Sequence, residues 1–299
     1  MSNTPISFKH VTKRFRNTIA LENITFTVPG PCVVGLVGPN GSGKSTLLRL
    51  LVGAITPTRG EISVFGLNPV DARLRATSVG YLAATDRMFP ELTVLENMLY
   101  RSQFYGVDRR EAPSLASGLL RDRGLYHLRN RKPGELSTGQ RRQVCLLSVL
   151  MHKPRIMLLD EPTTGIDMLA INEIYALMAE LCADDCTIIL ATHHIEELLS
   201  LCDRTLALSD GQLVQHCETR RLGSTRDQVR SSLQALFRGN VVPDPALQLE
   251  EPPSQRPDSP DLLSDAALAF PRAEGSEPSS FSRLRAAKEP VLHSQEGGR

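Results

Sequence analysis

Short apolar runs alternate with amphipathic stretches along the first 240 residues. Residues 32–37 (CVVGLV) are rich in β-branched side chains, and residues 155–159 (RIMLL) and 187–191 (TIILA) are similarly apolar. Runs this short and this uniformly apolar predict strands buried on both faces. Between the last two runs, apolar residues recur at helical spacing: Ile171, Ile174, Leu177, Met178 and Leu181. Strands separated by amphipathic helices predict an α/β fold with a mainly parallel sheet flanked by helices.

Residues 93–152 lack strand-like alternation and carry two helix-start signals. Thr93 is followed three positions later by Glu96, and Ser137 is followed in the same way by Gln140. Both pairs have the pattern of a capping box, in which each residue bonds the backbone of the other. We therefore expect a small helical subdomain over about residues 86–152.

Two more elements are expected before residue 240. Asp210-Gly211 is a two-residue turn signal between residues 204–209 and 212–215, which predicts a β-hairpin. After Thr225, a last apolar stripe at helical spacing predicts a helix: Val229, Leu233, Leu236 and Phe237.

Residues 241–299 differ in composition from residues 1–240. They hold 9 of the 20 prolines and 6 basic against 10 acidic side chains, so this tail has a charge of −4 and the body +5. Frequent proline and few apolar residues leave too little burial to offset chain entropy. We predict one domain over 1–240 and a Pro/Ser-rich disordered tail over 241–299. The tail is interpreted as inert, with docking of its short apolar patches on a partner as the alternative.

Whole-chain composition excludes several classes of protein. With 41% apolar residues among 299, a wholly disordered chain is excluded, and the net charge of +1 argues against nucleic-acid binding. No run approaches the roughly 18–20 apolar residues that cross a bilayer, and the first 15 residues do not have the apolar core expected of a signal peptide. The six cysteines have no zinc-site spacing, which is typical of reduced cytosolic thiols. The sequence therefore predicts a cytosolic chain that does not cross a membrane by itself.

A phosphate-binding loop follows the first apolar run. Residues 38–46 satisfy G-x-x-x-x-G-K-[ST] between a predicted strand and a predicted helix. The candidate nucleotide-binding residues are Gly38, Pro39, Asn40, Gly41, Ser42, Gly43, Lys44, Ser45 and Thr46. Glycines let backbone N–H groups surround phosphate oxygens, and the helix N-terminus adds positive potential. We expect Lys44 to reach the β- and γ-phosphates and the Ser45 hydroxyl to bind Mg²⁺.

Acidic and imidazole groups follow two other predicted strands. Asp160-Glu161 ends the run 155–159, and Thr192-His193-His194 follows the run 187–191. The carboxyl ends of parallel strands are where such a sheet places ligand groups. We expect Asp160 to hold Mg²⁺, Glu161 to act as the general base on water, and His193 to donate to the γ-phosphate. The alternatives are a solvated acidic cap for Asp160-Glu161 and, for His194 above all, a surface histidine that begins a helix.

Residues 136–140 then link the chain to a family. They read LSTGQ, which resembles the signature LSGGQ of the ATP-binding subunits of ABC transporters, with Thr138 in the third place. The phosphate loop, residues 156–161 (IMLLDE), Gly165-Ile166-Asp167 and His193 match the same family in the same order, over about residues 5–215. The resemblance implies an ABC-type P-loop ATPase that uses ATP and Mg²⁺.

The resemblance also implies roles for further residues. Phe15 matches the aromatic position that stacks on adenine, and Asp167 matches a loop aspartate that signals across a dimer. The signature residues Ser137, Thr138, Gly139 and Gln140 match those that contact nucleotide held by the other subunit. Two copies would then form a head-to-tail pair on the cytoplasmic face of the membrane, bound to a separate integral membrane permease.

One position departs from the family pattern. The usual glutamine after the strand at residues 79–82 is Ala84 in this chain. That glutamine contacts Mg²⁺ and the attacking water, and its loop touches the membrane partner. Alanine has no polar group for these contacts, so we hypothesise that Thr85, Asp86 or a water molecule replaces it.

Three functions are considered for a sequence with these motifs. The first is the ATPase subunit of a transporter, and residues 91–107 resemble subunits of bacterial exporters in particular. The second is an ABC ATPase acting on nucleic acid or ribosomes. It is disfavoured because only 93 positions separate Lys44 from Ser137, too few for a long coiled coil, and because there is a single set of motifs. The third is a regulatory subunit with weak hydrolysis, which Ala84 favours and Glu161 disfavours.

Overall fold

A six-stranded sheet forms the centre of the molecule. The computed structural model describes residues 5–71, 78–223 and 225–238. The sheet has the order β5-β6-β7-β3-β8-β9, and all its neighbouring strands are parallel except β8 and β9. Its strands are β3 (Val33–Val37), β5 (Val79–Leu82), β6 (Ile156–Asp160), β7 (Thr187–Ala191), β8 (Arg204–Ser209) and β9 (Gln212–Glu218). Every residue of β3, β6 and β7 is buried, which confirms the three buried strands expected from the sequence.

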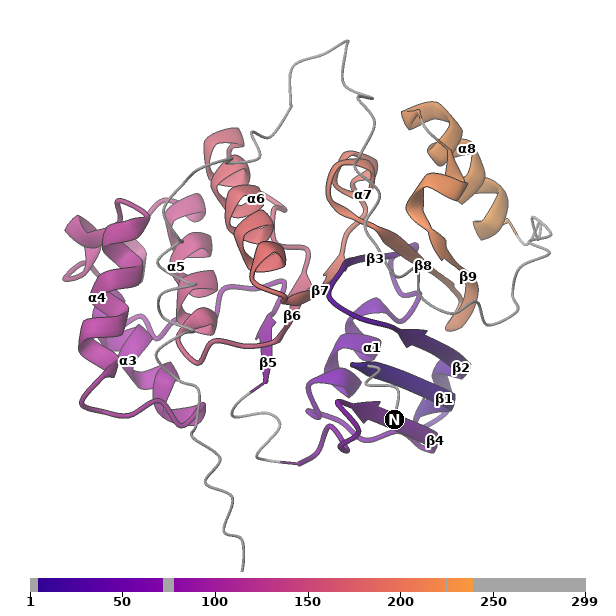
Figure 1. Ribbon diagram of the computed structural model, residues 1–299, viewed down its shortest axis with the longest axis horizontal. Coiled ribbons are helices and arrows are strands. Elements are labelled where there is room, and N and C mark those ends of the chain that lie inside the picture. The colour runs from indigo at the N-terminus through magenta and orange to yellow at the C-terminus, as the bar shows by residue number, and fades with distance from the viewer. Residues whose placement is uncertain (1–4, 72–77, 224, 239–299) are drawn as a thin grey trace, which may run out of the picture.

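Helices cover both faces of this sheet (Figure 1). Leu47 and Leu48 of α1 (Lys44–Leu51) share one core with Ile156 and Leu158 of β6. On the other face, α5 (Thr138–Leu150) and α6 (Met168–Ala183) share a second core with the neighbouring residues Met157 and Leu159. Alternation along β6 therefore places α1 and α5 on opposite faces of the sheet.

A second sheet was not predicted from the sequence. It is antiparallel, with the order β2-β1-β4, and consists of β1 (Ile6–Phe15), β2 (Thr18–Val28) and β4 (Arg59–Val64). One face packs on α1, and Phe8 stacks on Phe26 with ring centroids 4.6 Å apart. The register of β1 against β2 shifts between Phe8 and Val11 and again between Lys13 and Arg14. These bulges interrupt the strict two-residue alternation by which a half-buried strand is found in a sequence.

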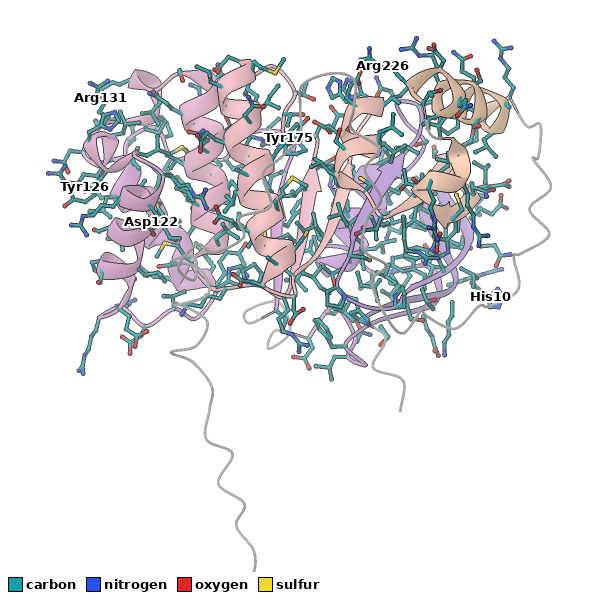
Figure 2. The ribbon with its side chains drawn as sticks, turned by 45° about the horizontal axis from the view of Figure 1, so that its top comes forward. His10, Asp122, Tyr126, Arg131, Tyr175 and Arg226 are labelled. Atoms are coloured by element: carbon teal, nitrogen blue, oxygen red, sulfur yellow. The ribbon has the colours of Figure 1, made fainter. Side chains whose placement is uncertain are left out.

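Residues 93–150 form the predicted helical region. It contains α3 (Val94–Phe104), α4 (Ala112–Asp122), the short 3₁₀ turns η1 (Tyr126–Leu128) and η2 (Pro133–Glu135), and α5. Both predicted capping boxes are present. The Glu96 amide donates to Thr93 Oγ1 at 3.2 Å, and the Gln140 amide donates to Ser137 Oγ at 3.1 Å. In Figure 2 the labelled Tyr126 and Arg131 lie at the outer end of this region.

The C-terminal elements also follow the sequence pattern. Strands β8 and β9 form the predicted hairpin, and α8 (Arg226–Phe237) begins at the N-cap Thr225 with Val229, Leu233 and Leu236 buried. The helix α7 (Ile195–Leu201) and the 3₁₀ turn η3 (Thr219–Leu222) lie beside it. The predicted disordered tail over 241–299 lies outside the described residues.

A half-buried histidine in this hairpin predicts acid sensitivity. Burial and, to a lesser extent, nearby Arg204 lower the pKa of His216 from 6.5 to about 4. Below pH 6.5 the unfolded chain binds a proton at His216 that the folded chain does not, so this contribution to stability falls as the pH drops toward 4. We expect His216→Gln to remove about 2 kcal/mol of the pH dependence of unfolding between pH 7.5 and 5.

Urea unfolding at the two pH values measures this effect. The control is His10→Gln, because His10 is an exposed histidine at the periphery of the molecule (Figure 2). The prediction is wrong if His216→Gln and the wild type lose the same stability on acidification.

Candidate functional site

The phosphate loop joins β3 to α1, and close packing requires glycine at two of its positions. A Cβ atom on Gly38 would lie 2.3 Å from the carbonyl oxygen of Leu208, so no larger residue fits there. Gly43 caps α1 with φ of 107° and would place a Cβ 2.7 Å from the carbonyl oxygen of Ala20. The first turn of α1 thus opens directly toward the loop, with its amides free for an anion.

Lys44 lies folded into this loop. Its side chain is buried, and Nζ donates to the carbonyl oxygens of Gly38 at 2.7 Å and Pro39 at 3.1 Å. Burial lowers the pKa of Lys44, while the carboxylates of Glu161 and Asp160 act in the opposite direction. Inside the same loop Ser42 Oγ is buried and has no hydrogen-bond partner among the described residues. An ammonium held only by carbonyls, beside an unpaired hydroxyl, fits a site for phosphate oxygens.

The carboxyl end of β6 places Asp160 and Glu161 beside the end of β7. Asp160 is paired in register with Ala191, and the Glu161 amide donates to the carbonyl of Ala191 at 2.9 Å. The Asp160 carboxylate is buried and accepts a hydrogen bond from Tyr81 Oη at 3.3 Å. Burial, followed by the charge of Asp160, raises the pKa of Tyr81, so Tyr81 remains a donor.

Glu161 and His193 are brought together. His193 Nδ1 lies 3.5 Å from Glu161 Oε1, and both side chains are partly open to solvent. Glu161 has a φ of 48°, in the left-handed region that residues with a side chain rarely adopt. His194, by contrast, occupies the N-cap position of α7, where its side chain makes no capping bond.

The donors expected for Mg²⁺ are the oxygens of Ser45 and Asp160. Among residues 5–71, 78–223 and 225–238, no group of three or more His, Cys, Asp or Glu residues could hold a metal ion. Mg²⁺ is commonly bound by one or two protein oxygens, with substrate phosphates and water completing the octahedron. The hydroxyl and carboxylate present here fit that kind of site.

The signature residues and the phosphate loop begin two different helices. Ser137 caps α5, whose start also contains Thr138, Gly139 and Gln140, and α5 lies across the sheet from α1 (Figure 1). Asp167 caps α6 by accepting from the Ala170 amide at 3.0 Å. A Cβ on Gly139 would lie 3.0 Å from Asp167 Oδ2, so these two predicted residues are neighbours. The structure therefore groups the predicted residues into two separate half-sites.

Phe15 lies at the end of β1 and is 43% exposed. The Lys13 ammonium lies 4.8 Å from the centroid of its ring. An exposed ring with a cation on one face and solvent around it leaves room for a stacked base.

Asp86 was one candidate to replace the glutamine that is missing at Ala84. Its carboxylate lies 3.3 Å from Arg142 Nη1 and 3.7 Å from Arg141 Nε. Asp86 is thus tied to the start of α5 by two arginines. A role for Asp86 in place of that glutamine therefore has to be compatible with these two ion pairs.

Arg142 is a residue that the sequence reasoning missed. It is buried, and its guanidinium donates to the carbonyl oxygen of Ala83, which precedes Ala84, and to that of Glu161. The signal was present, because Arg142 occupies the same helical face as the buried Gly139, Cys145 and Val149. A charged residue on an apolar helix stripe indicates a buried polar partner.

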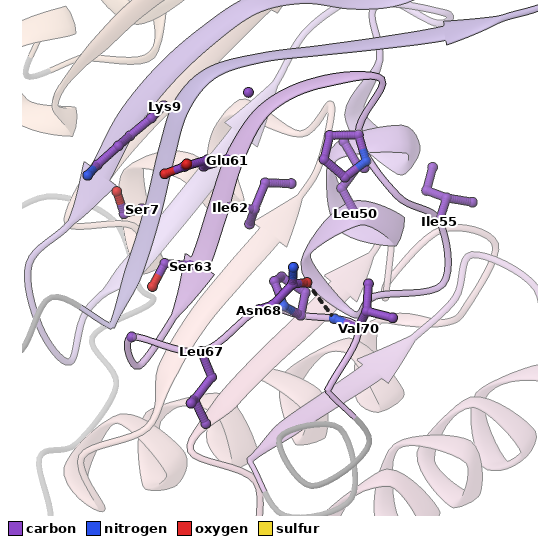
Figure 3. Close-up of a pocket in the computed structure, with 14 residues that line it drawn as sticks. Ser7, Lys9, Leu50, Ile55, Glu61, Ile62, Ser63, Leu67, Asn68 and Val70 are labelled. Atoms are coloured by element: carbon purple, nitrogen blue, oxygen red, sulfur yellow. Dashed lines mark hydrogen bonds between the residues drawn. The ribbon is translucent and has the colours of Figure 1, made fainter.

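A hollow beside the antiparallel sheet is a separate feature from this site. It has a volume of about 350 Å³ and is lined by residues of β1, β4 and the segment 66–70 (Figure 3). None of the predicted site residues lines it.

Within the described residues, no helix combines the length and apolarity needed to cross a bilayer.

Comparison with known proteins gives a consistent result. Residues 21–164 match the family described as "ABC transporter". The Nod factor export ATP-binding protein I of Rhizobium etli is 38% identical over 213 residues, which are 71% of this chain and 67% of that protein. The protein of the same name in Burkholderia thailandensis is 35% identical over 84% of this chain and 81% of its own length.

Solved structures agree with the sequence relatives. The structure of an ATP-binding subunit of an ABC transporter has a TM-score of 0.70 and 27% identity, and covers 77% of this chain and 100% of its own. A dimeric bacterial ABC transporter cassette has a TM-score of 0.66 and 28% identity over 72% of this chain and 99% of its own. A dimeric post-hydrolysis state of that cassette, bound to ADP and Pi, has a TM-score of 0.65 and 28% identity, with the same coverage. The chain therefore belongs to the ABC transporter family, as an ATP-binding subunit with the ATPase fold of that family.

Proposed function

We propose that this chain is the ATP-hydrolysing subunit of an exporter whose membrane-spanning permease is a separate chain. The observation that carries the proposal is that the phosphate loop begins α1 and the signature begins α5, two helices that pack on opposite faces of one sheet. In this proposal, Lys44 and Ser137 of one copy contact two different ATP molecules. Two copies arranged head to tail would bring the phosphate loop of each to the signature of the other, with two ATP molecules between them.

The residues of each half-site have complementary tasks in this arrangement. Lys44 exchanges its two carbonyl partners for the β- and γ-phosphates, and the amides at the start of α1 bind phosphate oxygens. The N-terminus of the partner's α5, capped by Ser137, contributes further donors to the γ-phosphate. Phe15 stacks on the adenine. Met168 and Leu169, which are 67% and 79% exposed beside Asp167, are apolar surface available to the second copy.

Hydrolysis is assigned to Glu161 and His193. Glu161 accepts the proton of the attacking water, and His193 lies within 3.5 Å of that carboxylate, where it can donate to the γ-phosphate. Ser45 and Asp160 would hold Mg²⁺, which neutralises charge on the phosphate oxygens when bound. The presence of both Glu161 and His193 supports hydrolysis over the purely regulatory alternative that Ala84 suggested.

Export and membrane attachment complete the proposal. Direction is inferred from likeness to Nod factor export ATP-binding proteins, and the permease places the chain at the cytoplasmic face of the membrane. A row of exposed aromatic residues on and before α3 offers the permease a docking surface. Phe89 and Tyr100 have ring centroids 4.8 Å apart, and Tyr100 and Phe104 5.1 Å apart. No nucleic-acid partner is part of the proposal.

Fractionation of the native cell tests this attachment. We expect the full chain to sediment with membranes and Phe104→Asp to release most of it, because a charge at a 67% exposed apolar contact opposes docking. ATP binding by the purified variant should not change. The matched control is Leu67→Asp, at an apolar position that is 47% exposed on another surface. Equal release of both variants, or none of either, would contradict the proposed surface.

A further inference from the structure

We infer that Arg142 is a positioning residue for hydrolysis, which acts by fixing the backbone turn that presents Glu161. This inference rests on the proposed function, in which Glu161 is the general base. Arg142 lies outside the phosphate loop, the LSTGQ signature and the other sequence motifs described above.

The guanidinium of Arg142 bonds three consecutive carbonyl groups of that turn. Nη2 donates to the carbonyl oxygens of Asp160 and Glu161, each at 3.1 Å, and Nε donates to that of Pro162 at 2.9 Å. The residue is 3% exposed, so water does not compete for these bonds. Carbonyls of neighbouring strand residues point in opposite directions, and only a chain that bends sharply can aim three in a row at one group.

The bend is costly without such support. Glu161 has a φ of 48°, a conformation that persists in a residue with a side chain only where its surroundings enforce it. The amide of Glu161 is bonded to Ala191 on β7, which fixes one side of the turn. Arg142 fixes the other side. Together they determine where the Glu161 carboxylate points, and hence its distance from His193.

The remaining nitrogen extends the link to the segment after β5. Nη1 donates to the carbonyl oxygen of Ala83 at 2.6 Å and lies 3.3 Å from Asp86 Oδ1. Every nitrogen of the guanidinium therefore has a partner, and Asp86 balances its buried charge. Because Arg142 lies three residues after Gly139 on α5, one side chain joins the signature helix, the Ala84 segment and the Glu161 turn.

The arrangement of the acceptors around Arg142 favours arginine over lysine. The flat fork of a guanidinium reaches carbonyls in several directions at once, whereas a lysine ammonium has three donors at one point. A lysine would keep the positive charge opposite Asp86 but would lose some of the hydrogen bonds to the carbonyl oxygens of residues 160–162. A variant series can therefore separate buried charge from positioning.

Steady-state kinetics of Arg142→Met, Arg142→Lys and the wild type make the first test. We expect kcat to fall about 30- to 100-fold in Arg142→Met and about 10-fold in Arg142→Lys, with KM for ATP and the Kd of a fluorescent ATP analogue within about 3-fold of wild type. The control is Arg123→Met, which removes a largely buried arginine paired with Glu180 away from the site. It should lower Tm but leave kcat within about 2-fold of wild type.

A double mutant gives the test that a merely structural role would not pass. If Arg142 acts through Glu161, adding Arg142→Met to Glu161→Gln should lower the residual turnover less than about 2-fold. Full additivity of the two losses would overturn the inference. So would an unchanged kcat in Arg142→Lys, the variant that carries the test if Arg142→Met fails to fold.

The variants distinguish failure of the proposed function from failure of this inference alone. If Glu161→Gln retains wild-type turnover, the proposed base is wrong and the inference falls with it. If Glu161→Gln loses turnover while folded Arg142→Met keeps its kcat, the proposed function stands and the inference alone is wrong.

Discussion

Replacing Lys44 with methionine is expected to eliminate measurable ATP turnover and to weaken ATP binding by about 100-fold or more. Each charge-assisted hydrogen bond from an ammonium to a phosphate contributes about 1.5–3 kcal/mol, and Lys44 is expected to make two. In the structure its Nζ donates to the carbonyl oxygens of Gly38 and Pro39. Loss of these two bonds leaves carbonyls that water can satisfy, so the loop keeps its shape while the nucleotide loses its main cation.

Methionine suits this test because the lysine stem is buried. Lys44 is 7% exposed, and an apolar side chain of similar length fills the same space. We expect Tm to change by only a few degrees. Isothermal titration calorimetry with ATP measures the affinity, and phosphate release measures the turnover. Lys9→Met, which removes an exposed lysine on β1, controls for the loss of one positive charge. Retention of wild-type affinity in Lys44→Met would remove the loop from the nucleotide site.

The features that the sequence predicted well are those encoded within a few neighbouring residues. Both capping boxes span only four positions, and the phosphate loop is recognisable from its own glycines and lysine. The strands β3, β6 and β7 were found because each is a short run of almost entirely apolar residues, so a short window was sufficient. In each case the local pattern and the tertiary environment demand the same residues.

The features that were missed depend on residues far apart in the chain. The antiparallel sheet holds β4 against β1 across more than 40 positions, and bulges interrupt its alternation. Arg142 bonds Ala83, 59 positions before it, and Glu161, 19 positions after it. Asp86 was considered as a free polar group because the residues near it in the sequence give no indication that Arg142 is its partner. Such pairs become visible only once the fold has brought the segments together.

Glu161→Gln is the substitution expected to separate ATP binding from hydrolysis. Glutamine has nearly the same shape as glutamate and can keep the contact with Thr164 Oγ1, but it cannot accept a proton from water. Loss of a general base lowers the rate by about 100- to 10,000-fold. The phosphate loop does not involve this side chain, so ATP should still bind.

A trapped dimer is the second consequence of the same change. Two ATP molecules held between phosphate loops and opposing signatures would link the copies until hydrolysis occurs, and without a base that event is rare. Size-exclusion chromatography with light scattering should therefore show the variant at about twice the mass of one chain with ATP and at the mass of one chain without it. The wild type should be dimeric only briefly. Glu173→Gln, on the exposed face of α6, is the matched control and should behave as the wild type.

The dimer result tests whether the phosphate loop of one copy and the signature of another bind the same nucleotide. If ATP bound at the phosphate loop of a single copy were sufficient for hydrolysis, the capped N-terminus of α5 and the exposed Met168 and Leu169 would have no ligand or partner to meet. A Glu161→Gln protein that binds ATP, does not hydrolyse it and stays monomeric at high concentration would contradict the shared site. If Glu161→Gln forms a stable ATP-dependent dimer and adding Ser137→Ala weakens it, the signature of one copy contacts the nucleotide bound by the other.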